Sequence, residues 1–587
     1  MRNIPLLLLA LLPAPSSTRA QATDSVVIET DVALVARDGT RLSADVYRPA
    51  PPGRYPVIVE RTPYDNRATG VAFGPLFAAH RYVYVAVDVR GRYDSQGTFY
   101  PYRDDASDGH DAIAWAATQP WSDGRVGTFG GSYLGFNQWL TAPGAPAALQ
   151  TMVVFVSPVD YFDSPAHTGG AFNLGGRLPW ALLVDDRENQ DLTAVDWTTG
   201  LRHLPLASAD SAIGRDMPHF RDWVINADKN EYWARYRVGN RWTAIDIPVL
   251  HVGGWYDEFL RGTLAGFTHM RQEAPSPGTR REQRMLIGPW THNVLGATGR
   301  VNDIEFGPDA VWRFQTELVA WYDRHLRDDT AVVFPGAPVR VFVMGSNRWA
   351  EFDDWPPPGA TPTRFYLHSA GRANSAGGDG RLDRSTAGEE PADTYRYDPA
   401  DPVPSVGGAT CCIAPGLYPE IMPWGPMDQR EVESRSDVLV YSTAPFDQPL
   451  TIVGPVRVRL HAASSAIDTD FTAKLVDVSP DGFARNLTDG IMRARYRTST
   501  AEASFLTPGE VYVFDIDLAA TANTFLHGHR LRLEISSSNF PWYDRNLNTG
   551  EHPAFGTESR TATQTILHDR ARASYVEVTV AGGGDRL

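Results

Sequence analysis

The stretch of sequence that decides the fold reads Gly130-Gly131-Ser132-Tyr133-Leu134-Gly135. It follows a strand-like run at 125–129 and leads into a helix-like run. Catalytic serines are often presented on such a tight strand-to-helix turn, and glycines flank them because the neighbouring backbones approach closely. The common pattern is Gly-x-Ser-x-Gly, whereas here Leu134 takes the place of the last glycine and Gly135 follows one position later. Since a glycine-rich turn with a serine is often only a turn, Ser132 needs support from the rest of the chain.

Strand and helix signals alternate on both sides of this turn. A polar-apolar alternation with the hairpin signal Asp38-Gly39 opens the chain, and short apolar runs bounded by helix-like segments follow it. Such an alternation predicts a parallel sheet wrapped by helices, as in the α/β-hydrolase fold. The apolar runs lie at 57–59, 82–87, 152–156, 247–250 and 285–288, and the clearest helical patterns at 106–118 and 311–326.

The length of 587 residues requires more than one domain. We predict a signal peptide at 1–20, an α/β-hydrolase catalytic domain at 21–157 and 244–352, a helical cap inserted at 158–243, and a C-terminal jelly-roll β-sandwich at 353–587. The cap is predicted because strand signals stop between the two catalytic segments, where a lid would sit. The jelly roll is predicted because the last part consists of many short, regularly spaced β runs.

The N-terminus and the composition limit the setting and the partners. Arg2, an apolar stretch at 4–12 and small residues up to Ala20 are typical of a secretory signal, which predicts a periplasmic or secreted protein. The net charge of −16, without a clustered basic tract, argues against nucleic acid and membrane surfaces as partners. Cys411 and Cys412 are adjacent, and they form either a vicinal disulfide or two small loop residues. No zinc motif is present, and we expect neither a metal nor another cofactor.

A serine nucleophile needs a histidine and a carboxylate, which in α/β-hydrolases follow in the order serine, acid, histidine. Asp257 follows the apolar run at 248–252, and His292 follows the run at 285–288. His292 would accept the proton of Ser132 as general base, and Asp257 would orient the imidazole and stabilise its charged form.

Other histidines and carboxylates are candidate catalytic residues or metal ligands. His251 lies inside a strand signal, which favours a packed core histidine over a catalytic one. Glu258 is next to Asp257 and should point elsewhere. Asp468 and Asp470 could suggest calcium, but alternate residues of a strand more often form a solvated face, which is the interpretation that we prefer.

An oxyanion hole needs two hydrogen-bond donors. The backbone N–H of Tyr133, the residue after the nucleophile, is the expected first donor. The loop after an earlier strand should supply the second, but Pro63 in that loop has no N–H. The hydroxyl of Tyr64 is a reasonable substitute, the alternative being that Tyr64 is a surface turn residue.

With these residues in view, the chain resembles the cocaine esterase and Xaa-Pro dipeptidyl-peptidase family of serine hydrolases, named CocE/NonD. The resemblance implies a catalytic α/β-hydrolase domain, a helical cap and a jelly roll. It implies a triad of Ser132, Asp257 and His292 and an oxyanion hole formed by Tyr64 and the Tyr133 backbone, and the shifted glycine is the family's own pattern. The segments that carry it are 61–64, 88–97, 130–135, 253–257, 288–292, 401–408 and 538–541.

The family divides by substrate into enzymes for esters, β-lactam acyl groups, α-amino acid esters and Xaa-Pro peptides. Members that act on α-amino substrates resemble one another in extra carboxylates near the catalytic acid. Here Glu258 is acidic, but the next residues, Phe259 and Leu260, are apolar. We therefore favour an esterase or acylase for an uncharged or acidic acyl group, with Trp180, Trp255 and Phe259 lining the substrate pocket.

Two alternatives stay open. The first is an Xaa-Pro dipeptidyl-peptidase or α-amino acid ester hydrolase. The second, which the complete triad disfavours, is an inactive scaffold whose β-sandwich binds a ligand. The expected partner is a small-molecule ester or amide, and self-association into a homo-oligomer is left open.

Overall fold

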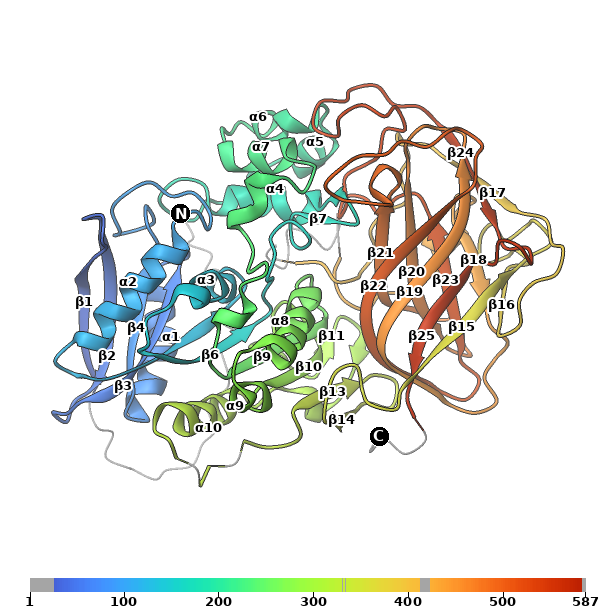
Figure 1. Cartoon of the computed structure of the whole chain (residues 1–587). Helices are drawn as coiled ribbons and strands as arrows, with labels where there is room; N and C mark the ends of the chain where they lie inside the picture. The colour runs from blue at the N-terminus through green and yellow to red at the C-terminus, as the bar shows by residue number, and fades with distance from the viewer. Residues whose placement is uncertain (1–25, 330, 333, 412–422, 583–587) are drawn as a thin grey trace.

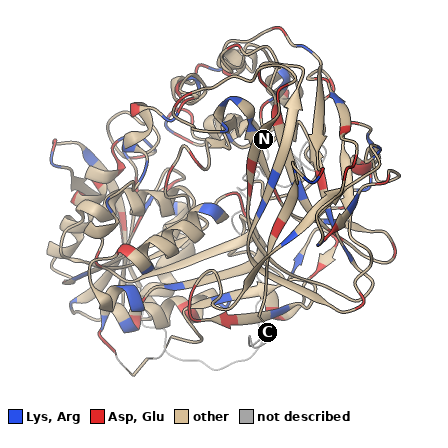
Figure 2. Cartoon of the chain, turned by 45° about the vertical axis from the view of Figure 1, so that its right-hand side comes forward, with Lys and Arg blue, Asp and Glu red and all other residues tan. Residues whose placement is uncertain are grey.

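The computed structural model describes residues 26–329, 331–332, 334–411 and 423–582. The predicted signal peptide and Cys412 therefore lie outside the described residues, so neither the signal peptide nor the vicinal disulfide is tested. In Figure 1 a sheet flanked by helices occupies the left side, a small helical layer lies above it, and a β-rich domain lies to the right. Figure 2 shows acidic and basic residues interspersed over all three parts. Among the described residues, no helix has the length and apolar character to cross a membrane.

The first sheet has ten strands in the order β1-β2-β4-β3-β5-β6-β9-β10-β13-β14. The strands from β4 to β13 are parallel, and β1, β2 and β14 pair antiparallel at the edges. Their apolar residues are buried on both faces, as expected of a parallel sheet covered by helices. The bounds are β1 (Val26–Val35), β2 (Arg41–Pro49), β3 (Tyr55–Thr62), β4 (Val83–Asp88), β5 (Ser122–Gly131), β6 (Leu149–Phe155), β9 (Val249–Tyr256), β10 (Arg284–Thr291), β13 (Val339–Val343) and β14 (Arg348–Phe352).

Helices cover both faces of this sheet. Ile113 and Phe136 bring α2 and α3 into one core cluster, and Phe77 and Trp321 bring α1 and α10 into another. The predicted order of strands and helices is thus confirmed, with boundaries shifted by a few residues. The helices are α1 (Asn66–Ala79), α2 (Asp105–Thr118), α3 (Tyr133–Thr141), α8 (Leu260–Glu273), α9 (Pro277–Arg281) and α10 (Phe314–Leu326).

The chain between β6 and β9 leaves the sheet and forms the helical layer at the top of Figure 1. Its core is aromatic: Trp180 stacks on Trp223 with ring centroids 5.7 Å apart, and Tyr161 contacts Trp223 at 5.4 Å. Its elements are β7 (His167–Thr168), β8 (Ala171–Phe172), α4 (Leu174–Leu183), α5 (Trp197–Arg202), α6 (Ala209–Ala212) and α7 (Pro218–Ile225). We refer to this segment as the cap.

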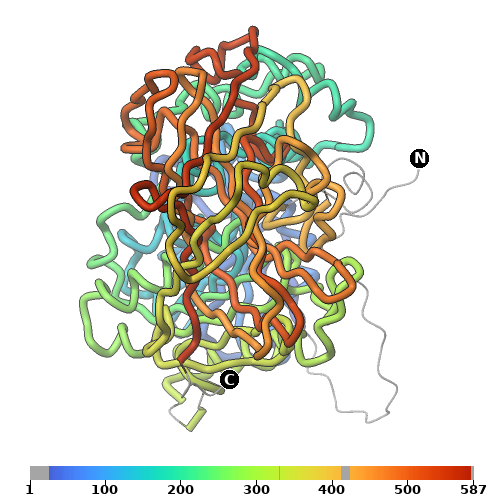
Figure 3. Tube along the Cα trace, turned by 90° about the vertical axis from the view of Figure 1, so that its right-hand side faces the viewer, coloured from blue at the N-terminus to red at the C-terminus, as the bar shows by residue number. Residues whose placement is uncertain are grey.

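The C-terminal domain is built on an eleven-stranded, largely antiparallel sheet that faces the viewer in Figure 3. Its interior is continuous with that of the catalytic domain, because Tyr256 and Ile287 belong to the same buried cluster as Leu460 and Phe514. The bounds are β15 (Thr361–His368), β16 (Arg381–Asp383), β17 (Asp393–Tyr397), β18 (Leu439–Ser442), β19 (Leu450–Ser464), β20 (Asp470–Val478), β21 (Ala484–Arg493), β22 (Tyr512–Phe525), β23 (Arg530–Ser536), β24 (Ala562–Leu567) and β25 (Tyr575–Val580). The predicted fold, an α/β-hydrolase with a cap and a C-terminal β-sandwich domain, is confirmed.

The prediction of a solvated face at Asp468 and Asp470 is wrong. Both carboxylates are buried. Asp470 opens β20, which pairs with β21 on one side and β23 on the other and is covered on both faces, and Asp468 lies two residues before this strand. Arg495 Nε donates to Asp468 Oδ2 at 2.7 Å, and Arg493 Nη2 donates to Asp470 Oδ2 at 2.9 Å. The two aspartates are therefore members of buried ion pairs.

Candidate active site

Ser132 stands on a strained turn between β5 and α3. Its φ and ψ are 58° and −124°, a region that residues other than glycine rarely adopt. The backbone N–H of Ser132 donates to the carbonyl oxygens of Phe155 at 3.1 Å and Val156 at 2.9 Å, at the end of the adjacent strand β6. This geometry is that of a nucleophile elbow, in which the strained backbone holds the side chain above the sheet edge.

The glycines around Ser132 are required by close approaches. A Cβ on Gly131 would lie 2.3 Å from the ring of Phe155, and a Cβ on Gly135 would lie 2.6 Å from the Cβ of Ser157. The shifted glycine of the sequence motif therefore sits where α3 passes the chain that leaves β6.

Asp257 and His292 follow two neighbouring strands. Since β9 and β10 are parallel and in register through Gly254 and Gly288, their carboxyl ends meet at one edge of the sheet. His292 Nδ1 lies 2.7 Å from Asp257 Oδ1, and Asp257 Oδ2 accepts the backbone N–H of Phe259 at 3.1 Å. The Asp257 side chain is fully buried, whereas that of His292 is 21% exposed. The engaged Nδ1 leaves Nε2 as the ring nitrogen available for proton transfer.

The three predicted residues thus lie at the same edge of the sheet. Ser132 follows β5, which is separated from β9 only by β6, and the carboxyl ends of β5, β6, β9 and β10 all point in the same direction. His251 lies within β9, away from this edge, and is buried. Its Nε2 is 3.1 Å from Gln283 Oε1, and its ring stacks on Trp139. Burial lowers the pKa of His251 to about 3. The prediction that it is a packed core histidine is confirmed.

Tyr64 is held from two sides rather than being a surface turn residue. Its Oη accepts a hydrogen bond from Trp180 Nε1 at 2.9 Å, and its ring lies edge-on to Tyr133 with centroids 6.4 Å apart. Burial raises the pKa of Tyr64 to about 12, so the hydroxyl keeps its proton at neutral pH. On the backbone side, Arg92 Nε donates to the carbonyl oxygen of Pro63 at 2.9 Å.

The Tyr133 N–H opens α3 and has no acceptor within that helix. The side chain of Tyr133 is fixed separately, because its Oη donates to Asp105 Oδ2 at 2.6 Å and its ring stacks on Tyr102 at 4.1 Å. Arg61 Nη1 lies 2.8 Å from Asp105 Oδ1, and Arg61 Nη2 donates to Thr141 Oγ1 at 2.9 Å. Arg61 therefore joins the loop that carries Tyr64 to the helix that follows Ser132.

The sequence analysis does not predict the roles of Arg61 and Arg92, although both lie in segments that carry the family resemblance, 61–64 and 88–97. Arg92 is fully buried and also donates to the carbonyl oxygens of Val184 and Asp186 and to Asn189 Oδ1, all in the cap. For Arg92 the signal that could have found this role is an arginine in the glycine-containing loop that follows a buried strand, because a buried guanidinium needs several acceptors. Arg61 is the second-last residue of β3, and no comparable local signal marks it.

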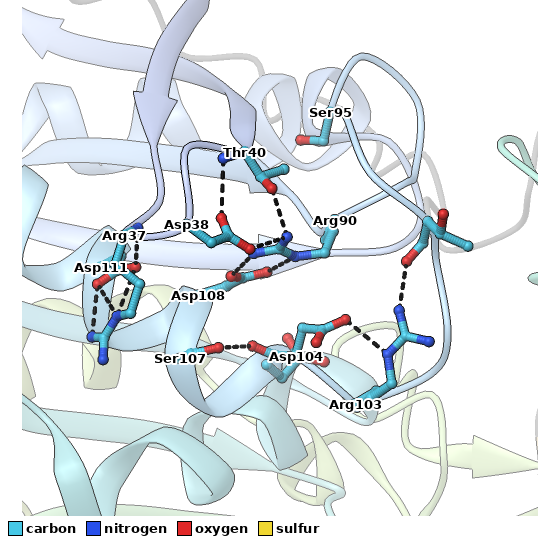
Figure 4. A network of polar contacts seen from close by, with 12 residues as sticks. Arg37, Asp38, Thr40, Arg90, Ser95, Arg103, Asp104, Ser107, Asp108 and Asp111 are labelled. Atoms are coloured by element: carbon cyan, nitrogen blue, oxygen red, sulfur yellow. Dashed lines mark hydrogen bonds and ion pairs between the residues drawn. The ribbon is translucent and has the colours of Figure 1, made fainter.

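Arg90, in the same motif, stabilises the first hairpin. Figure 4 shows its guanidinium between Asp38 and Asp108, with Thr40 as a third partner. Arg90 Nη2 lies 2.6 Å from Asp108 Oδ1 on α2, and Nη1 lies 2.7 Å from Asp38 Oδ2 in the β1–β2 turn. The hydrogen bond with Asp108 and that with Asp38 raise the pKa of Arg90. This contact is structural.

Glu258, next to Asp257, pairs with the cap. Both of its carboxylate oxygens lie 2.9 Å from Arg177 Nη2 on α4, and the two side chains are 1% and 3% exposed. No local sequence pattern predicts this ion pair, since the two residues are 81 positions apart.

The predicted pocket residues separate into two groups. Trp180 lies beside Tyr64 as described, and Phe259 lies against His292 with ring centroids 5.2 Å apart. Trp255 does not join them. Its indole N–H donates to the carbonyl oxygen of Phe342 at 2.7 Å, and its ring packs against Trp355 in the core shared with the C-terminal domain. These contacts and its burial make Trp255 a core residue and not a pocket residue.

The described residues contain no group of three histidine, cysteine or carboxylate side chains placed to hold a metal ion. The arrangement at the sheet edge is that of acyl-transfer chemistry: a strained serine, a histidine oriented by a buried carboxylate, and a tyrosine hydroxyl on the facing loop.

Comparison with known proteins identifies the family to which the chain belongs. Residues 38–294 match the family model of the X-Pro dipeptidyl-peptidase (S15 family), and residues 335–577 match that of the X-Pro dipeptidyl-peptidase C-terminal non-catalytic domain. The chain is 39% identical to cocaine esterase from Rhodococcus sp. (strain MB1 Bresler) over 549 residues, which cover 89% of this chain and 93% of that protein.

Two solved structures extend the similarity to the whole architecture. An aminopeptidase from the marine sediment archaeon Thaumarchaeota archaeon superposes with a TM-score of 0.84 at 26% identity, and an α-amino acid ester hydrolase with a TM-score of 0.83 at 26% identity. Each comparison covers 97% of this chain and 98% of the other. The chain therefore belongs to the CocE/NonD family of cocaine esterase and the X-Pro dipeptidyl-peptidases, and it is a serine hydrolase.

Proposed function

We propose that the protein is an esterase or acylase that cleaves a small-molecule ester or amide through Ser132, His292 and Asp257. The observation that carries this proposal is the His292–Asp257 pair at the sheet edge to which the strained turn of Ser132 also belongs. The named activity of the relative with 39% identity supports an ester substrate.

The reaction proceeds in two halves. Ser132 Oγ attacks the acyl carbon while its proton passes to His292 Nε2, and the resulting tetrahedral intermediate expels the alcohol or amine, which takes up that proton. Water then attacks the acyl-enzyme and gives a proton to His292, which passes a proton to Ser132 Oγ as the acid is released and the free serine is restored. Asp257 stabilises the imidazolium in both halves through its bond to Nδ1.

Two donors stabilise the negative charge that develops on the acyl oxygen. The Tyr64 hydroxyl and the Tyr133 backbone N–H are assigned this role, because Tyr64 keeps its proton and the N–H has no acceptor within its helix. A hydroxyl is needed in place of a second backbone donor because Pro63 has no N–H.

The acyl group is proposed to be uncharged or acidic. An α-ammonium group would need a free carboxylate, and Glu258, the acidic residue next to Asp257, is already compensated by Arg177. Phe259 adds an apolar ring beside His292. The named activities of the two structural neighbours favour a second candidate, an enzyme for α-amino substrates such as a dipeptidyl-peptidase or α-amino acid ester hydrolase.

The deciding experiment compares hydrolysis of p-nitrophenyl esters with that of Ala-Pro p-nitroanilide, with Ser132→Ala as the blank. The proposal expects ester hydrolysis that Ser132→Ala abolishes, and no dipeptide release. Efficient release of Ala-Pro would establish the second candidate. Failure of a fluorophosphonate probe to label Ser132, together with no hydrolysis, would mean that the chain is an inactive scaffold.

We also propose export to the periplasm or the medium, from the signal-like residues 1–20. Fractionation of cells expressing the full chain, with N-terminal sequencing of the product, tests this. A mature chain beginning near residue 21 is expected, and a cytoplasmic chain that keeps its N-terminus would contradict it.

A further inference from the structure

One cap helix contacts both loops of the proposed catalytic machinery. Arg177 and Trp180 lie one turn apart on α4, so their side chains project from the same side of the helix. Arg177 pairs with Glu258, the neighbour of Asp257, and Trp180 bonds to Tyr64. The helix thus links the acid loop after β9 to the oxyanion loop after β3.

The direction of the bond between Trp180 and Tyr64 is fixed by chemistry. An indole N–H only donates, so the Tyr64 oxygen must be the acceptor in this contact. The single proton of the Tyr64 hydroxyl therefore does not point at Trp180, and the hydroxyl can donate it to another acceptor. A hydroxyl that accepts one hydrogen bond is also polarised into a stronger donor for the next.

We propose that Trp180 is a positioning residue, which holds Tyr64 with its hydroxyl proton directed at the oxyanion of the tetrahedral intermediate. This inference rests on the oxyanion role proposed above for Tyr64. Trp180 acts only through Tyr64, and its hydrogen bond complements the backbone anchor that Arg92 provides at Pro63.

The indole is held rigidly enough for this task. Trp180 is 5% exposed, and its ring stacks on Tyr102 at 6.0 Å with an interplanar angle of 16° and on Trp223 at 5.7 Å with an angle of 21°. The guanidinium of Arg177 lies 5.6 Å from the centre of the same ring. Because Arg177 is itself fixed by Glu258, the cap helix cannot shift Trp180 without breaking a buried ion pair.

The sharpest test removes the indole N–H while keeping the shape of the ring. We would replace Trp180 with 3-benzothienylalanine, in which sulfur stands in place of the N–H, and make Trp180→Phe as a second variant. Each is combined with wild-type Tyr64 and with Tyr64→Phe, and kcat and KM are measured with a p-nitrophenyl ester. Trp233→Phe serves as the matched control, because Trp233 is also a buried tryptophan of the cap, but its indole N–H donates to the carbonyl oxygen of Asn226 and not to Tyr64.

With Tyr64 present, loss of the N–H should lower kcat by about three- to tenfold, the worth of one hydrogen bond, and leave KM nearly unchanged for the isostere. In the Tyr64→Phe background the same change should have no effect, since no hydroxyl remains to be positioned. Trp233→Phe should have the same effect in both backgrounds.

Two outcomes would overturn the inference while the proposed function stands. Tyr64→Phe could lower kcat while the isostere at 180 leaves it unchanged, or the isostere could lower kcat equally with and without the Tyr64 hydroxyl. If Tyr64→Phe itself leaves kcat unchanged, the proposed oxyanion role of Tyr64 fails first. Thermal unfolding of every variant separates these results from loss of the fold.

Discussion

His292 Nδ1 lies 2.7 Å from the Oδ1 of a fully buried Asp257, so the carboxylate selects which ring nitrogen carries the proton. Asp257→Asn keeps the shape of the side chain but favours the wrong tautomer of His292. We expect the fold to survive and kcat to fall by up to about ten-thousand-fold, as in other serine triads. Ester hydrolysis and circular dichroism of the variant test this, and near-normal turnover would mean that the catalytic acid is another residue.

Tyr64→Phe removes one proposed oxyanion donor and leaves the ring in place. We expect kcat to fall by about a hundredfold or more, because the donor acts on charge that develops only in the transition state. A change confined to KM would instead make Tyr64 a residue that binds the substrate. The comparison requires kcat and KM for the same p-nitrophenyl ester, with Tyr366→Phe, on β15 of the C-terminal domain, as the control.

Arg177→Met removes the guanidinium that pairs with Glu258 in the protein interior. We expect the free energy of unfolding to fall by about 3 kcal/mol or more, the usual cost of an uncompensated buried charge. The double variant Arg177→Met with Glu258→Leu should recover most of that loss, because neither charge is then buried. Urea unfolding measures both values, and equal losses in the single and double variants would show that packing, not charge, dominates at this place.

Glu60, on β3, supplies a prediction about pH. The side chain is buried, and burial raises the pKa of Glu60 from 4.5 to about 8. The folded state therefore holds a proton that the unfolded state releases above pH 4.5, and stability contributed by this group falls as pH rises from about 4.5 to about 8. Glu60→Gln cannot titrate and should lose less stability than the wild type over that interval.

Melting temperatures of wild type and Glu60→Gln at pH 5 and pH 8 test this prediction. Glu502→Gln, at an exposed position, is the matched control and should follow the wild type. Parallel pH profiles for Glu60→Gln and the wild type would mean that Glu60 titrates alike in the folded and unfolded states.

The order of strands, the strained serine turn and the positions of Asp257 and His292 could all be predicted, because each depends on a local pattern. Strand ends in a parallel sheet meet at one edge, so residues that follow separate strands converge without any further information. The same logic points to Tyr64 as a proposed donor, because Pro63 removes a backbone donor from its loop.

The contacts of the cap could not be predicted. Trp180 and Tyr64 are 116 positions apart, and Arg177 and Glu258 are 81 apart, so no periodicity connects either pair. The prediction of Trp255 as a pocket residue failed because the motif at 253–257 indicates where the strand ends but not which face of the sheet the indole occupies. Asp468 and Asp470 were assigned to a solvated face because two carboxylates at alternate positions look alike in the sequence whether they meet water or buried arginines.

The interior shared by the catalytic and C-terminal domains limits how the two can be exchanged or expressed separately. Tyr256 and Ile287 pack in one cluster with Leu460 and Phe514, and the Tyr256 hydroxyl donates to the carbonyl oxygen of Asn486 at 3.0 Å. If the two domains were produced separately, by cutting the chain near residue 353, each would expose to solvent an apolar surface that is buried in the intact protein. The two segments match separate family models, yet calorimetry should find that they unfold as a single cooperative unit.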